Sequence, residues 1–501
     1  MIYIYIENQK FSNKIKYVFN NIFFNLGLKH KFVNKLEKIE SQDVDIAIIY
    51  SQSEEYEKHI KNHRNFLNYI IVKDSMQLFN EDYYMHKCSL SNLDVQTYSF
   101  NNDIELVSLF SLDSKIFSNK IVENKTSIFT TNLDIISNAF FMLTRYEEVV
   151  STNLQKDIHD RVIGRESIAY KNNFLHRPIV NEYIMFLWSI IDSFHLGYKK
   201  KNWWKNKKFA TCLTHDVDKV FKYSKLKSEI KNCGRLLLID KSISKAIKNL
   251  ILFVNSKRDY KKDLFWNLDE VMNKELKRGF KSSFYFMSGG NSQVDNNYSV
   301  QDERIINLIQ FVEDKGFEAG YHGSYNSYNN LEMMRCEKMS LDKLIKNMSY
   351  GCRQHYLRFN VPKTWMIQEK IGIKYDASLG YADCEGFRCG YCFPYKPYDL
   401  INDRVINIWE IPLIVMEGTI VGRQYSNLDK KEGLKRIKQL IETTEKYNGV
   451  FNLLWHNSSF DIMDKTWAEW IDAYDEVLDF LLSKDTFGTS GRKIIDLVNK
   501  F

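Results

Sequence analysis

Short apolar runs alternate with longer amphipathic stretches along the second half of this chain. The runs are too short for helices and carry Phe, Tyr and Thr, which is typical of buried strands. The pattern predicts strands at 209–213, 282–287, 317–321 and 356–359, with 372–376 leading into another. Helices are predicted at 219–257, 265–278, 302–315, 331–348 and 364–370. We therefore expect a parallel sheet, closed or curled into a barrel-like α/β domain, with helices outside it.

The first 200 residues are predicted to form a smaller α/β domain of their own. Its clearest elements are a strand, a helix, a buried strand and a later amphipathic helix, at 2–6, 14–24, 44–50 and 134–150. Residues 199–208 are basic and polar, so we expect a domain boundary between about 195 and 208. The barrel-like domain then spans 205–501.

The composition excludes several classes of protein. The net charge is only +7, from 70 basic and 63 acidic residues, and the Lys residues are spread out, so we expect no nucleic-acid binding. No apolar run approaches the ~20 residues of a transmembrane helix. The amino terminus lacks the pattern of a signal peptide, which favours a cytoplasmic location. The composition indicates no particular oligomeric state.

Three of the eight cysteines, Cys384, Cys389 and Cys392, lie close together in the sequence. Cys389 and Cys392 form a CxxC pair, but three thiols are one short of a four-thiolate zinc site. We expect reduced, partly buried thiols here, and neither a disulfide nor a zinc site.

The strand at 209–213 leads into Thr-His-Asp-Val-Asp. Ligands and catalytic residues of α/β folds gather at such strand ends. Asp216 and Asp218 lie two residues apart and share a face of an extended backbone. Two neighbouring carboxylates repel unless a cation lies between them, which suggests a divalent metal ion held by one Asp and a general base formed by the other. The alternative is a strand end whose solvated acids cap the next helix.

Further polar residues follow other predicted strands. They are His322, Arg353, His355, Arg358, Asp376 and His456. A barrel would collect all of these side chains at one mouth. Their combination therefore predicts an active site.

Four motifs resemble the polysaccharide deacetylase family with the NodB-type domain. They are Thr-His-Asp-Val-Asp at 214–218, Gly-Tyr-His-Gly-Ser-Tyr at 320–325, Arg-Phe-Asn-Val-Pro at 358–362 and Leu-Trp-His at 454–456. The preceding region, with SNAFFMLTRYEE and RPIVNEY, resembles the amino-terminal domain of one bacterial branch of these proteins. The resemblance implies a distorted (β/α) barrel with fewer than eight strands, preceded here by the smaller α/β domain. It also implies metal-dependent removal of an N- or O-acetyl group from a sugar.

The resemblance assigns roles to individual residues. Asp216 matches the general base that activates water, and His456 matches the general acid. Asp218 and His322 match metal-ligand positions, and Arg358 lies in the motif that orients the base. The expected cofactor is a divalent metal ion, with zinc as the expected ion.

One metal ligand departs from the family pattern. The family has two His four residues apart in its second motif, whereas Asn326 follows His322 at that spacing here. We expect His355 to take the place of the missing ligand, with Arg353 beside it in the catalytic site. The alternative is a stacking or structural role for His355. The aromatic residues expected to line the mouth and contact the substrate are Tyr325, Tyr356 and Trp455.

Amide hydrolysis needs an activated water, stabilisation of the oxyanion and a proton for the departing nitrogen. Bound Zn²⁺ lowers the pKa of water toward ~7 and polarises the carbonyl, while a carboxylate and an imidazole supply base and acid. We expect a deacetylase of an acetylated sugar or sugar conjugate, nucleotide-linked or lipid-linked, in surface polysaccharide biosynthesis. The alternatives are a catalytically degenerate carbohydrate-binding protein and a hydrolase of another non-peptide C–N bond, such as that of a cyclic amide.

Overall fold

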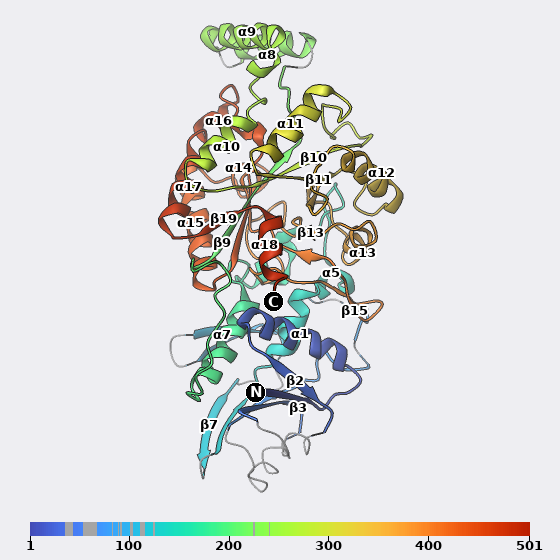
Figure 1. Cartoon of the computed structure of the whole chain (residues 1–501), viewed down its shortest axis with the longest axis vertical. Coiled ribbons are helices and arrows are strands. Elements are labelled where there is room, and N and C mark those ends of the chain that lie inside the picture. The colour runs from blue at the N-terminus through green and yellow to red at the C-terminus, as the bar shows by residue number, and fades with distance from the viewer. Residues whose placement is uncertain are drawn as a thin grey trace.

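The computed structural model describes residues 1–35, 44–53, 68–82, 84–88, 90, 93–100, 104–110, 116–123, 126–223, 226–239 and 241–501. The amino-terminal part, a barrel and a helical hairpin follow one another along the long axis of the molecule (Figure 1). The hairpin consists of α8 (Leu226–Leu238) and α9 (Ile243–Arg258). No helix in the described ranges is both long enough and apolar enough to span a membrane.

The amino-terminal part is built on a six-stranded sheet with the order β2-β1-β3-β4-β8-β7. The pairings are parallel except that of β7 with β8. One face of this sheet packs on three helices in a continuous apolar core, namely α1 (Ser12–Leu26), α4 (Ile135–Leu143) and α7 (Ile179–Asp192). The strands are β1 (Ile2–Ile6), β2 (His30–Val33), β3 (Ile46–Ser51), β4 (Asn68–Lys73), β7 (Ser118–Glu123) and β8 (Thr126–Thr131), and β5 (Gln96–Phe100) forms a separate antiparallel pair with β6 (Ile104–Ser108).

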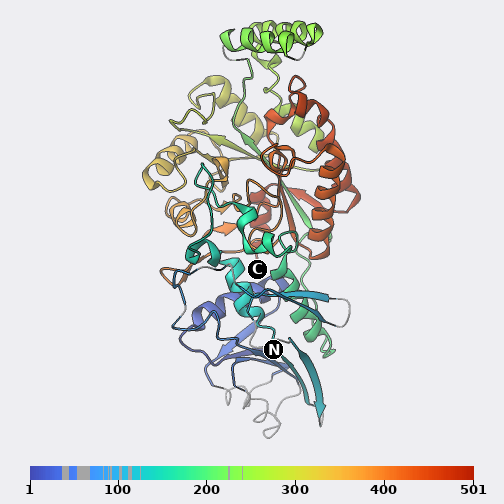
Figure 2. The same cartoon turned by 180° about the vertical axis from the view of Figure 1, so that it is seen from behind.

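The second sheet has the order β16-β13-β12-β11-β10-β9-β18-β17, and its pairings are parallel. Its strands are β9 (Ala210–Val217), β10 (Ser283–Met287), β11 (Glu318–Gly323), β12 (Gly351–Gln354), β13 (Tyr375–Asp376), β16 (Trp409–Glu410), β17 (Val415–Met416), β18 (Val450–Leu454) and β19 (Phe487–Thr489), the last paired with β9. The helices around it include α10 (Leu268–Leu276), α11 (Glu303–Asp314), α12 (Leu331–Asp342), α13 (Lys363–Lys370), α15 (Lys430–Lys446), α17 (Ala473–Ser483) and α18 (Gly491–Val498) (Figure 2). The structure confirms the predicted α/β class and the distorted (β/α) barrel.

β9 and β12 differ from the strands predicted at 209–213 and 356–359. β9 continues to Val217 because its pairing with β10 runs to that residue, so Asp216 lies inside the strand. β12 ends before the predicted strand begins, and Tyr356 and Leu357 have positive φ values of 60° and 54°. Left-handed backbone at two successive residues is incompatible with a strand and turns the chain at this point.

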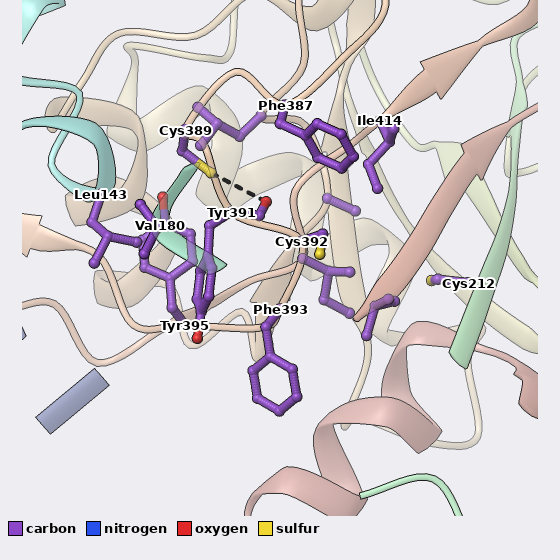
Figure 3. Packing of buried hydrophobic residues seen from close by; sticks show 14 of the residues in the cluster. Leu143, Val180, Cys212, Phe387, Cys389, Tyr391, Cys392, Phe393, Tyr395 and Ile414 are labelled. Atoms are coloured by element: carbon purple, nitrogen blue, oxygen red, sulfur yellow. Dashed lines mark hydrogen bonds between the residues drawn. The ribbon is translucent and has the colours of Figure 1, made fainter. Parts of the chain in front are cut away.

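The amino-terminal part and the barrel share one apolar core. Figure 3 shows Leu143 and Val180 of the first part in the same cluster as Phe387 of the barrel. Cys389 and Cys392 lie in this cluster as free thiols. Burial raises the pKa of Cys389 to about 12, so its thiol stays protonated at neutral pH.

The segment 193–209 connects the two parts and contacts both. Trp203 and Trp204 are buried in it. Nε1 of Trp203 donates to the carbonyl oxygen of Asn25 at 2.8 Å, and Nε1 of Trp204 donates to that of Asn448 at 2.7 Å. The two indoles therefore pack the junction, while the position of the domain boundary stays a prediction.

A buried ion-pair cluster also joins the two parts. The helix predicted at 134–150 is interrupted at Arg145, whose φ is 52°, and resumes as α5 (Tyr146–Val150). Nε of Arg145 donates to Oε1 of Glu148 at 2.9 Å, and Arg388 of the barrel donates to both oxygens of the same carboxylate, at 2.9 and 2.7 Å. Burial disfavours the charge on Glu148, but the two guanidinium groups lower its pKa to about 2.

Replacing Glu148 with Gln should destabilise the protein, because it removes the carboxylate that two buried guanidinium groups share. Loss of one partner from a buried pair costs about 3–5 kcal/mol of unfolding free energy, measurable by urea titration. Lys207→Ala is the matched control, since its ion pair with Asp485 is about half exposed and such pairs contribute only about 0–1 kcal/mol. Equal unfolding midpoints for the two variants would contradict this account of the junction.

Candidate metal centre and active site

Asp218, His322 and His355 come together at the carboxyl ends of three strands. Asp218 directly follows β9, His322 lies near the end of β11, and His355 directly follows β12. Oδ1 of Asp218 lies 3.1 Å from Nε2 of His322 and 3.6 Å from Nε2 of His355. The ligand atoms of the three residues all lie within 4.8 Å of one another. The structure thus places the three residues predicted as metal ligands around one point.

The second ring nitrogen of each histidine has a partner in the protein. Nδ1 of His322 donates to the carbonyl oxygen of Arg353 at 3.0 Å, and Nδ1 of His355 lies 3.3 Å from Oδ1 of Asp295. Such partners fix the tautomer and leave Nε2 with its lone pair toward the centre. Two imidazole nitrogens and one carboxylate oxygen form a donor set common in catalytic zinc sites. The residues present therefore fit a divalent metal ion.

Asp216 lies two residues before Asp218 on β9 and is almost fully buried. Its Oδ1 lies 3.5 Å from Nε of Arg353, and its Oδ2 lies 3.8 Å from Nε2 of His322. Arg353 is fully buried and donates from Nη2 to Oγ1 of Thr214 at 2.6 Å. Within the described ranges, Oδ1 of Asp216 and Nε of Arg353 have no hydrogen-bond partner. Asp216 is thus held beside a fixed positive charge with an oxygen available to a ligand.

His456 follows β18 and reaches the same cluster. Its Nε2 lies 3.7 Å from Oδ2 of Asp218, and its Nδ1 donates to Oε1 of Glu417 at 2.7 Å. Glu417 is fully buried and also accepts from Oγ of Ser459 at 2.6 Å. Burial lowers the pKa of His456, but Glu417 and Asp218 outweigh it and raise the pKa to about 10. The imidazole therefore carries a proton at neutral pH.

Asp295 and Glu417 are not among the residues predicted from the sequence. Glu417 directly follows β17, so it occupies the same kind of strand-end position as the predicted site residues. A prediction of strand β17 would have identified it. Asp295 lies in irregular chain eight residues after β10 ends at Met287, and no local pattern marks it.

Two of the three predicted substrate-binding aromatic residues lie near the cluster. The ring of Tyr356 lies 4.8 Å from that of His355 and 5.5 Å from that of Tyr325, and both tyrosines are half-buried. Trp455 is only 1% exposed and packs on Tyr474 at 5.1 Å between ring centroids. This corrects the expectation that Trp455 lines the mouth, because its ring is packed in the apolar core.

Arg358 contacts the wall of the mouth rather than Asp216. Its Nε donates to the carbonyl oxygen of His159 at 2.8 Å, and its Nη1 donates to that of Tyr325 at 2.5 Å. The left-handed turn after β12 separates it from the strand end. Arg353, inside β12, is the guanidinium that faces the Asp216 carboxylate, which corrects the expectation for Arg358.

Asp376 stays outside the cluster. It is fully buried, and its Oδ1 accepts from Nε2 of Gln368 at 2.6 Å and from Oγ of Ser378 at 2.8 Å. Burial raises the pKa of its carboxyl group. Asp376 therefore belongs to the packing of the barrel rather than to the strand-end site.

The amino-terminal part of the chain contributes to the mouth. Nδ1 of His159 lies 3.0 Å from the hydroxyl of Tyr325, and Nη1 of Arg161 donates to the carbonyl oxygen of Tyr356 at 3.1 Å. Asp157 accepts from Nε of Arg161 at 2.7 Å and holds it in place. Their local sequence is an ordinary polar stretch and carries no sign of this contact.

A family of unknown function (DUF7033) matches residues 2–195 of the chain. No curated protein matches its sequence. Among solved structures, a protein from Mycobacterium smegmatis described as a polysaccharide deacetylase is 15% identical, with a TM-score of 0.37 over 60% of this chain and 93% of that one. PuuE allantoinase is 12% identical, with a TM-score of 0.39 over 61% and 96%. Agd3, a carbohydrate deacetylase, is 7% identical, with a TM-score of 0.33 over 99% and 87%.

Replacing His322 with Ala should abolish stoichiometric binding of added Zn²⁺, because one of three donors is lost. Elemental analysis after dialysis should find about one ion per wild-type chain. Asp295→Asn should weaken affinity about 10–100-fold, since the outer partner of a ligating histidine tunes the site.

Cys392→Ser is the control for this experiment and should keep the wild-type zinc content. Zinc that survives His322→Ala but is lost in Cys392→Ser would assign the metal to the cysteine cluster instead.

Proposed function

We propose that the protein is a metal-dependent hydrolase that removes an acetyl group from an N- or O-acetylated sugar. The arrangement around Asp218 carries this proposal. Two histidines suited to hold a metal ion lie beside this carboxylate, and Asp216 and His456 approach it from the ends of β9 and β18. Hydrolysis of an amide or ester needs such a combination of metal ligands, base and acid.

Asp218, His322 and His355 would hold the ion, and we take zinc as the ion because of this donor set. When bound, it supplies a Lewis acid that polarises the acetyl carbonyl and lowers the pKa of water toward ~7.

The residues of the chain account for the proton transfers. Asp216 accepts a proton from the attacking water, and Arg353 fixes the orientation of the carboxylate. The water oxygen bonds to the acetyl carbon, and the bond from that carbon to the sugar nitrogen or oxygen breaks. His456 donates its Nε2 proton to the departing atom while Nδ1 stays hydrogen-bonded to Glu417. The products are acetate and a free amine or hydroxyl group.

The set of candidate ligands has three members despite Asn326. Asn326 is exposed, and its Oδ1 accepts from Nη1 of Arg358 at 3.3 Å. His355 supplies the third donor from the neighbouring strand. This supports catalysis over the alternative of a degenerate carbohydrate-binding protein, which rested on a missing ligand.

The half-buried rings of Tyr325 and Tyr356 support a sugar as the substrate, since aromatic faces pack well on the apolar face of a sugar ring. We place the reaction in surface polysaccharide biosynthesis, on a nucleotide-linked or lipid-linked sugar. All eight cysteines are free, as is usual in a reducing compartment, which supports a cytoplasmic location.

Asp216→Asn and His456→Ala should each lower kcat for acetate release by about 10²–10⁴-fold, as expected for the loss of a general base or acid. Zinc content and folding should be retained. Acetate is measured with N-acetylated sugars, both nucleotide-linked and lipid-linked.

Asp472→Asn is the control for this assay, because Asp472 is an exposed carboxylate on the outer surface of the barrel. Wild-type turnover in either site variant would contradict the assigned roles. An inactive zinc-loaded wild type across the whole panel would instead favour the binding-protein alternative.

A further inference from the structure

The α8–α9 hairpin lies at the end of the molecule opposite the amino-terminal sheet, with both helices across the long axis (Figures 1 and 2). The stretch 219–257, predicted as helical, forms these two helices. Asp218 precedes α8 by eight residues. Met463, seven residues after His456, packs in a cluster with Leu236 of α8. The hairpin is thus rooted on the segments that follow two site residues.

One face of α9 is apolar and exposed. Its residues, between 39% and 69% exposed, share one side of the helix and are Ile243, Ile247, Leu250, Ile251 and Val254. Ala246 belongs to a separate buried cluster with Leu236 of α8 and Met463, and Leu252 packs against that cluster. Ile230 and Leu237 of α8 add 62% and 45% exposed side chains. A contiguous aliphatic surface of this kind marks a contact site.

The hairpin also carries almost all of the net charge of the chain. Residues 226–258 contain eight basic and two acidic residues, a net charge of +6, and the remaining 62 basic and 61 acidic residues nearly balance. The exposed bases are Lys231, Arg235, Lys241, Lys245, Lys248, Lys257 and Arg258. In the described part of the hairpin, Glu229 is the one acidic residue. Its side chain is buried, and its Oε2 accepts a hydrogen bond from Nδ2 of Asn249 at 3.2 Å. Basic residues occur along the whole chain, but the excess of basic over acidic residues is concentrated in the hairpin.

These two properties favour one occupant over the others. A second copy of the chain would bring one +6 hairpin against another, and the charges would repel. A nucleic acid would neutralise the bases but leave the aliphatic face in water. An anionic lipid surface satisfies both, because aliphatic side chains enter the interface while lysines contact the headgroups. Since no described helix can span a bilayer, the hairpin would lie on the surface.

We propose that the α8–α9 hairpin is an interfacial anchor that binds an anionic lipid bilayer and places this end of the barrel against it. The aliphatic face of α9 enters the boundary between headgroups and acyl chains. The exposed Lys and Arg side chains pair with lipid phosphates and strengthen binding to negatively charged membranes.

Vesicle flotation of the full chain tests this proposal. Wild-type protein should float with vesicles of phosphatidylglycerol and phosphatidylcholine, and weakly or not at all with phosphatidylcholine alone. The double variant Lys245→Glu, Lys248→Glu should lose on the order of tenfold or more in affinity for the anionic vesicles. The double variant Ile247→Asp, Ile251→Asp should lose at least about tenfold, since two buried aliphatic side chains are removed from the interface.

Ile401→Asp is the matched control, because Ile401 is 70% exposed but lies between β14 (Tyr398–Asp399) and β15 (Arg404–Val405), away from the hairpin. It should bind vesicles like the wild type, and circular dichroism should show all variants folded. Failure of the wild type to float with anionic vesicles would overturn the proposal. So would unchanged flotation of both hairpin variants.

Two further outcomes would identify a different occupant. A wild-type dimer that the isoleucine variant converts to monomer, seen by light scattering, would assign the face to self-association. Binding to duplex DNA that depends on the lysines but not on the isoleucines would assign it to nucleic acid. Flotation needs no substrate, so its failure leaves the proposed deacetylation untouched, and an inactive enzyme can still float.

Discussion

The candidate site depends on holding two carboxylates, Asp216 and Asp218, close together in a largely buried place. Burial disfavours ionisation of Asp218, but its imidazole neighbours lower the pKa of this carboxyl group. Three imidazoles, from β11, β12 and β18, lie within 3.7 Å of it, and Arg353 faces Asp216 at 3.5 Å. Because these groups come from four different strands, the parallel register of the sheet decides whether the site forms.

The amino-terminal part is bound to the barrel by more than a linker. Apolar side chains from both parts form one core, and the Glu148 carboxylate takes hydrogen bonds from a guanidinium of each. His159 and Arg161 then extend across the junction to the tyrosines of the mouth. The shape of the mouth therefore depends on both parts of the chain folding together. Domains joined only by a flexible linker would not depend on each other in this way.

The repeated alternation of strands and helices was enough to predict the barrel, because short apolar runs and amphipathic stretches differ in the spacing of their apolar residues. The convergence of Asp218, His322 and His355 also followed, since residues at the carboxyl ends of parallel strands meet at one edge. Local pattern could not predict the left-handed turn at Tyr356, which directs Arg358 away from Asp216. Nor could it find Asp295, whose place depends on the path of an irregular segment.

The second nitrogen donor of the candidate metal site, His355, comes from the end of β12 rather than from the segment after His322. A search pattern that demands two histidines four residues apart would reject the sequence, although its donor atoms lie within 4.8 Å of one another. A comparison of donor positions in space would retain it. In a chain that lacks the second histidine of the pattern, the strand next to the one that carries the first histidine should therefore be inspected for a replacement donor.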